Sequence, residues 1–188
     1  KGTAYALNNS FASGGTTSIT NSGTVTKNAT GNITSTGAFS TTGDVNLAAN
    51  ITTTDTNLTI GGNLVIAEAA TPTLSTGAGT AGNVLVSGTT NGTTGGVAET
   101  LTVQAGTGTA TFTGNVGNNA NGTELEALTI TNAAATTFSG TLDLANALTQ
   151  TNAATGTTTF TGAVAVGSAD LKGTAYALNN SFASGGTT

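Results

Sequence analysis

The motif that decides the fold occurs three times, as TATFTGNVG at residues 109–117, AATTFSGTLDL at 134–144 and TTTFTGAVAVG at 157–167. In each copy a phenylalanine is followed by Thr or Ser, by a glycine and then by apolar residues: Val116 alone, Leu142 with Leu144, and Val164 with Val166. Alternation of apolar and polar residues with a period of two indicates a β-strand, and glycine favours a turn. We therefore predict short strands joined by tight turns.

The spacing of the motif predicts how these strands are arranged. Four phenylalanines follow one another along the second half of the chain, and they are Phe112, Phe138, Phe160 and Phe182. Their intervals of about 22 to 26 residues are typical of stacked repeat folds. We predict an all-β, parallel β-solenoid of about eight coils per 171-residue unit, in which these four side chains form a structural ladder. A pair of tandem antiparallel β-sandwich domains is the alternative.

The two ends of the sequence are identical. Residues 1–17 read KGTAYALNNSFASGGTT, and residues 172–188 read the same. Residues 1–171 are therefore interpreted as one tandem repeat unit and residues 172–188 as the start of the next, cut from a longer precursor; an engineered duplication is the alternative. We expect the two copies to adopt the same local structure, related by translation along a common axis, with or without a rotation.

The composition excludes most chemistry. The chain has no Cys and no His, so it holds no thiolate, no imidazole base and no zinc, haem or iron–sulfur ligand set. Its three basic residues are lysines and its net charge is −5, which argues against nucleic acid as a partner. The longest apolar run, residues 64–67, is far too short for a membrane-spanning helix. We expect no enzyme activity, no catalytic residues and no cofactor.

The acidic residues are the remaining candidates for a site. They are dispersed along the chain, which favours solvated surface charge, and they are Asp44, Asp55, Glu68, Glu99, Glu124, Glu126, Asp143 and Asp170. Glu124 and Glu126 would share one strand face, so they are the weak candidates for a calcium site at an interface. Calcium is the one ion that this composition leaves open.

Several segments resemble a known group of proteins. The stretches NLTIGGNLVI, AETLTVQAGTGTATFTGNVG, ALTITNAAATTFSGTLDL and TTTFTGAVAVG are similar to the β-strand repeats of large bacterial surface proteins, the filamentous-haemagglutinin-like adhesins and autotransporter passengers. The resemblance covers about residues 44–167. It implies a right-handed β-solenoid exported to the cell surface, and it supplies no catalytic or binding residues.

These observations predict a class of function. A tandem array without catalytic groups favours a structural, extracellular protein that forms a fibre, sheath or surface layer by strand stacking, with itself as axial or lateral partner. The alternative is the stalk of a large bacterial adhesin, with a host-cell or glycan ligand. A minor alternative is an ice-binding solenoid, because Thr-x-Thr triplets recur along the chain, although at irregular spacing.

Overall fold

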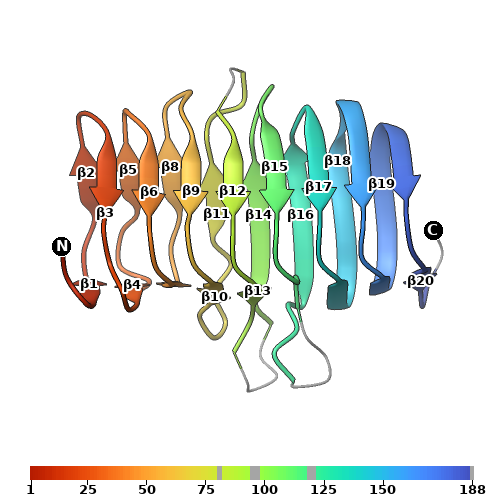
Figure 1. The fold of residues 1–188 in the computed structure, drawn as a ribbon, viewed down its shortest axis with the longest axis horizontal. Coiled ribbons are helices and arrows are strands. Elements are labelled where there is room, and N and C mark those ends of the chain that lie inside the picture. Colours follow the sequence, from red (N-terminus) through yellow and green to blue (C-terminus); the bar gives the residue numbers. More distant parts are fainter. Residues whose placement is uncertain (80–81, 94–97, 118–121, 187–188) are drawn as a thin grey trace.

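The protein is an all-β parallel solenoid of about eight coils (Figure 1). The computed structural model describes residues 1–79, 82–93, 98–117 and 122–186. Every pairing between named strands within these ranges is parallel, and each strand pairs with the equivalent strand of the next coil, as Tyr5 does with Val25. The predicted solenoid is confirmed, and the antiparallel sandwich is wrong. The same residues contain no helix, so none of them forms an apolar helix long enough to cross a membrane.

Each coil passes over three faces. Face 1 consists of β1 (Tyr5–Leu7), β4 (Val25–Lys27), β7 (Val45–Leu47), β10 (Leu64–Ile66) and β13 (Thr90–Asn91). Face 2 consists of β2 (Phe11–Ser13), β5 (Ile33–Ser35), β8 (Ile51–Thr53), β11 (Thr73–Ser75), β14 (Thr100–Gln104) and β16 (Ala127–Asn132). Face 3 consists of β3 (Thr17–Ile19), β6 (Phe39–Thr41), β9 (Leu58–Ile60), β12 (Val84–Val86), β15 (Thr109–Phe112) and β17 (Ala135–Phe138).

The last coils contain longer strands that turn the corners between faces. β18 (Leu142–Phe160) pairs with β16 on face 2 and with β17 on face 3. β19 (Val164–Leu178) follows β18 around the coil, and β20 (Phe182–Ser184) pairs with the beginning of β19 on face 1. β18 begins on face 1, where Leu142 bridges to Val116, and then runs along faces 2 and 3, so it joins these two faces into one 15-stranded sheet.

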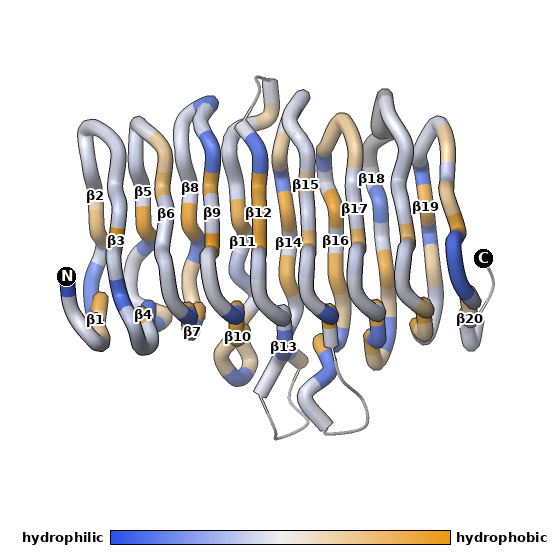
Figure 2. Tube along the Cα trace, viewed as in Figure 1, coloured by the Kyte–Doolittle hydropathy of each residue, from blue (hydrophilic) through white to orange (hydrophobic). Residues whose placement is uncertain are grey.

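The core is a column of apolar side chains enclosed by the three faces. Most strands are three residues long, with the first and third residues buried and the middle one directed outward, as in Leu58–Ile60. Such a strand needs only two apolar residues, and stacking supplies the rest of the contacts. Apolar residues accordingly recur at corresponding positions of successive coils (Figure 2). This explains how a chain with 36% hydrophobic residues encloses a continuous core.

The recurring TF(T/S)G motif turns the corner between face 3 and face 1. The phenylalanine ends the strand on face 3 with its ring inside, and the glycine lies under the glycine of the preceding coil. A Cβ atom on Gly140 would stand 2.7 Å from the carbonyl carbon of Gly114, and one on Gly162 would stand 2.3 Å from the carbonyl oxygen of Gly140. The motif therefore needs glycine because successive coils leave no room for a side chain there.

Asparagine side chains connect successive coils at all three corners. The residue before a strand is often Asn, and its Oδ1 accepts a hydrogen bond from a backbone N–H of the next coil. Asn50 accepts from Thr73 (2.8 Å) before face 2, Asn57 from Asn83 (2.9 Å) before face 3, and Asn63 from Thr89 (2.9 Å) before face 1. Corner amides that leave the strand ladder thus find partners in the neighbouring coil.

One buried lysine interrupts the apolar column on face 1. Lys27 is 1% exposed and lies in register between Leu7 and Leu47. Its Nζ donates to the carbonyl oxygens of Asn28 and Thr30, both at 2.8 Å. Burial lowers the pKa of Lys27 below its usual value of 10.5. The second coil therefore carries a lysine amine among apolar neighbours.

The two copies of the 17-residue segment form equivalent strands on different faces. Tyr5 pairs with Val25 on face 1, whereas Tyr176, its identical counterpart, pairs with Thr158 on face 3. Phe11 likewise lies on face 2, and its counterpart Phe182 lies on face 1. The offset from the first copy to the second thus corresponds to seven complete coils and two further faces. The copies are related by a translation combined with a rotation of one face.

Candidate functional site

The phenylalanine ladder has three members in register. The rings of Phe112 and Phe138, and those of Phe138 and Phe160, are stacked with centroids 5.3 Å apart and planes within 7°. The strand residue below Phe160 is Leu178, not Phe182. Phe182 lies on face 1 beside Val164, and its ring meets Phe160 edge-on at 5.6 Å. The prediction that Phe182 is the fourth member of the ladder is wrong. The last coil is shorter than the interval between Phe160 and Phe182, so Phe182 lies beyond the position under Phe160.

Three corner loops interrupt the regular coils between face 1 and face 2. Within the described residues they comprise 67–72, 92–93 with 98–99, and 117 with 122–126, and they lie at the same edge of the solenoid (Figure 1). The second and third loops are hydrogen-bonded to each other, because the Gly92 N–H donates to Thr123 O at 3.0 Å and the Glu126 N–H donates to Glu99 O at 2.9 Å. The second and third loops therefore form one protruding structure across neighbouring coils.

Glu99 lies inside this structure and not on the surface. It is 3% exposed because it precedes Leu101 by two residues and so has the inward phase of β14. Its Oε1 accepts hydrogen bonds from the N–H of Thr93 at 3.3 Å and from the Thr93 hydroxyl. The expectation that every acid is solvated surface charge is wrong at this position. A buried carboxylate with few partners is costly, so Thr93 stabilises the loop by satisfying one of its oxygens.

The two predicted calcium candidates flank a buried residue of the third corner loop. Leu125 is fully buried and bridges to Leu144, while Glu124 and Glu126 on either side are half-buried. Glu126 Oε1 accepts from the Asn146 side-chain amide at 3.0 Å. The Oε2 atom of Glu124 is buried and has no hydrogen-bond partner among the described residues.

This arrangement does not gather a set of ligands. Within the described ranges, no three Asp, Glu, His or Cys side chains come together closely enough to hold a metal ion. Calcium prefers six to eight oxygen ligands, so two neighbouring carboxylates would need further oxygens from elsewhere. The calcium site at Glu124 and Glu126 stays a prediction.

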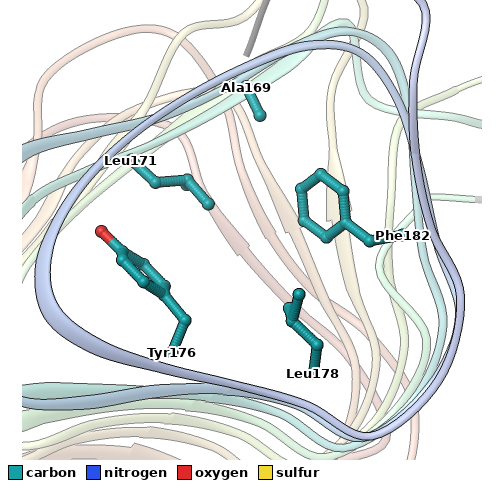
Figure 3. A pocket seen from close by; sticks show the side chains of 5 residues that line it. All are labelled: Ala169, Leu171, Tyr176, Leu178 and Phe182. Carbon is teal, nitrogen blue, oxygen red and sulfur yellow. The ribbon is translucent and has the colours of Figure 1, made fainter.

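The second candidate feature is the C-terminal end of the solenoid. An apolar hollow of about 350 Å³ opens there, which we call the open end, and it is lined by Ala169, Leu171, Tyr176, Leu178 and Phe182 (Figure 3). Tyr176 is 39% exposed and Leu178 is 54% exposed, the two large apolar side chains that stand out as exposed in the described chain. The side chains point into the interior of the last coil, where the next coil of a solenoid would cover them.

The backbone at both ends is also available for pairing. At the N-terminal end, β1, β2 and β3 each pair with a strand of the second coil and have no partner on the other side within the described chain. At the C-terminal end, β20 pairs with β19 alone among the strands that the structure describes. Exposed strand edges of this kind are templates for further strands.

The comparisons add no relative. Neither family models, nor curated proteins, nor solved structures gave a match to this chain. The β-solenoid fold is therefore what is established for this chain.

Proposed function

We propose that the protein is a structural, extracellular repeat protein that assembles along the solenoid axis into a fibre, sheath or surface layer. The observation that supports this proposal is that one sequence stacks at two places along the axis: the 17-residue segment forms parallel pairs in the first coil, on faces 1 and 2, and its identical copy forms parallel pairs in the last coils, on faces 3 and 1. Natural solenoids cap their ends with polar residues when stacking has to stop.

The charge of the chain is consistent with axial growth. The described chain has one ion pair, Lys172 with Asp170 at 3.6 Å, and both side chains are well exposed. With eight acids against three lysines, the sides of neighbouring molecules repel each other at low salt. Stacking at the ends buries apolar surface and pairs backbone groups, and both gains are insensitive to this repulsion.

A stalk that holds a binding tip away from the cell is the second candidate. It is favoured by the resemblance of residues 44–167 to adhesin and autotransporter repeats, which serve at the bacterial surface. A stalk uses the same stacked coils and needs no contact between molecules. The two functions therefore differ in whether separate molecules associate.

Electron microscopy of the purified protein over a range of concentrations tests the proposal. Axial assembly predicts filaments, or layers of them, with a spacing along the axis of ~4.8 Å between coils; in a chain with several tandem units, successive 171-residue units would lie ~37 Å apart. Analytical ultracentrifugation gives the matching solution measurement. Monomers that persist at high concentration, together with specific binding to host cells or glycans, would replace the fibre with the stalk.

A further inference from the structure

The residues at the open end have identical counterparts whose covering partners are visible at the other end. Three of the five lining residues belong to the second copy of the 17-residue segment, and their first-copy counterparts lie in the first coil. The pairs of counterparts are Tyr176 with Tyr5, Leu178 with Leu7, and Phe182 with Phe11. The first coil thus shows which residues complete this sequence on the side that the open end leaves bare.

Residues of the second coil cover the first copy in a fixed register. Tyr5 pairs with Val25 and Leu7 pairs with Lys27 on face 1, and Phe11 pairs with Ile33 on face 2. Val25 and Ile33 are fully buried by these contacts and by the third coil. All of the partners lie within residues 18–35.

We propose that the open end is the docking surface for a second copy of residues 18–35 that continues the same chain. The second copies of Val25, Lys27 and Ile33 would cover Tyr176, Leu178 and Phe182 in the register of the first copy. This inference rests on the proposed function of a stacked repeat protein, because it names the segment of the same chain that covers the open end where one unit meets the next. It goes further by fixing the residues, the register and the face on which each strand lies.

The inference includes a rotation between successive units. Tyr176 lies on face 3, so the second copy of Val25 also lies on face 3, whereas the first Val25 lies on face 1. Without a rotation, the second copy of Val25 would lie on face 1 against Phe182, and the stretch equivalent to Phe11–Val25 would have to make a whole coil. That stretch is clearly shorter than the shortest coil on face 1 of the structure, which runs from Val164 to Phe182. The chain is therefore too short for the unrotated arrangement.

Disulfide trapping in an extended chain tests this register, and the absence of cysteine from the protein makes the experiment clean. The chain is extended after Thr188 by residues 18–35, and a cysteine replaces Thr26 in the appended copy. Ala177 is the counterpart of Ala6, which pairs with Thr26 in the first coil. Neighbouring strands hold paired residues about 4.8 Å apart, within the range that a disulfide spans.

Two second positions distinguish the arrangements. Combined with the appended T26C, A177C should form a disulfide in nearly all molecules under mild oxidation, whereas A183C should form little. The pair A6C with T26C in the first copy is the matched positive control, because the structure places both residues outward and in register. Preferential trapping of A183C would show an unrotated unit and would overturn the inference, as would the absence of both disulfides in molecules where the control pair forms.

A stability measurement gives an independent readout. Covering the open end should raise the Tm of the extended chain by roughly 2–4 °C over that of the original chain. The control carries V25D and I33D in the appended copy and should lose the whole gain. An equal Tm for the two extended chains would overturn the inference. If the original protein forms filaments but A177C forms no disulfide, the proposed assembly stands and this register is refuted. If A177C forms the disulfide but the protein forms no filaments, this register stands and the proposed assembly is refuted.

Discussion

A Cβ atom on Gly114 would stand 2.5 Å from the carbonyl oxygen of Gly88 in the coil above it. That distance is far shorter than any normal contact, so the two coils approach each other through glycine. We therefore expect G114A to force the coils apart at this corner and to lower the free energy of unfolding by about 1–3 kcal/mol, the usual range for overpacking. Urea unfolding followed by circular dichroism measures this change.

Gly14 provides the control for that substitution. It is exposed, its φ is not positive, and a Cβ atom on it would have no atom within 4 Å. G14A should leave the stability unchanged or raise it slightly, because alanine restricts the unfolded chain. Equal losses from G114A and G14A would contradict the close approach of the coils.

The corner asparagines should contribute to stability through their side-chain oxygen. Asn83 Oδ1 accepts from the N–H and from the hydroxyl of Thr109, at 2.9 and 3.1 Å. Its side chain is exposed, so N83A should lower the free energy of unfolding by about 0.5–1.5 kcal/mol. N83D keeps an acceptor at the same place and should retain most of the stability. If N83A and N83D behave alike, the hydrogen bonds to Thr109 are not what stabilises this corner.

The middle ring of the phenylalanine ladder should be the most sensitive core position. Phe138 is 2% exposed and stacks on Phe112 above and on Phe160 below. F138A should cost about 3–5 kcal/mol through lost burial and the cavity that remains. F182A should cost less, because Phe182 is only partly buried at the open end. Thermal or urea unfolding of both variants would rank them, and a larger loss for F182A would contradict the ladder.

Lys27 should make the stability depend on pH in the alkaline range. Its pKa is lowered in the folded state, so between that pKa and the usual value of 10.5 the unfolded chain binds more protons than the folded one. The free energy of unfolding contributed by this group therefore rises as the pH rises through that window, and the penalty is fully present below the folded pKa. Urea unfolding at a series of pH values measures the slope.

K27M is the variant that isolates this contribution. Methionine keeps an unbranched apolar chain of similar length and does not titrate, so the rise should disappear. All other groups are the same in both proteins, so their contributions cancel in the difference. A slope that K27M leaves unchanged would assign the pH dependence to other groups.

Removal of divalent ions should leave the protein unchanged. The described residues gather no set of three metal-ligating side chains around Glu124 and Glu126, so we expect the same Tm with a chelator and with added calcium. The double variant E124Q/E126Q is the control. A large loss of stability on chelation that calcium reverses, and that the double variant abolishes, would establish the calcium site and contradict this expectation.

The inward and outward positions of the strands could be predicted from the sequence because one residue pattern serves every coil. In each strand, two apolar residues on either side of one outward residue are enough to set the inward positions, as with Leu58 and Ile60 or Val84 and Val86. The repetition of this pattern along the chain then predicts that the strands stack. The face on which a given residue lies could not be predicted in the same way. Coil lengths on one face are unequal, since the coil from Thr90 to Val116 is much longer than the later one that ends at Phe182. Phenylalanines at nearly equal intervals in the sequence therefore need not lie on the same face of the solenoid.

The polar part of the structure was less accessible to sequence reasoning. Asn50 and Asn63 connect coils through their side chains, but asparagine is so common in this chain that no single residue is distinguished by its type. Glu99 appeared as one of eight dispersed acids, and its burial depends on the phase of β14 and on Thr93, which approaches it through the loop. A charged residue in the inward phase of an apolar alternation, as at Glu99 and Lys27, is the signal that could have found both.

The rotation between the two copies of the segment determines how a longer array would look from the side. In such an array, each unit would place its corner loops, with Glu99, Glu124 and Glu126, two faces further along the coil than the unit before, which is one face short of a full turn. The protrusions would then follow a three-fold screw, and the same side would repeat after three units, or ~110 Å at ~4.8 Å per coil. A neighbouring filament that contacts these corner loops would meet them only at every third unit. Bundles of such filaments would show an axial period three times the axial length of one 171-residue unit.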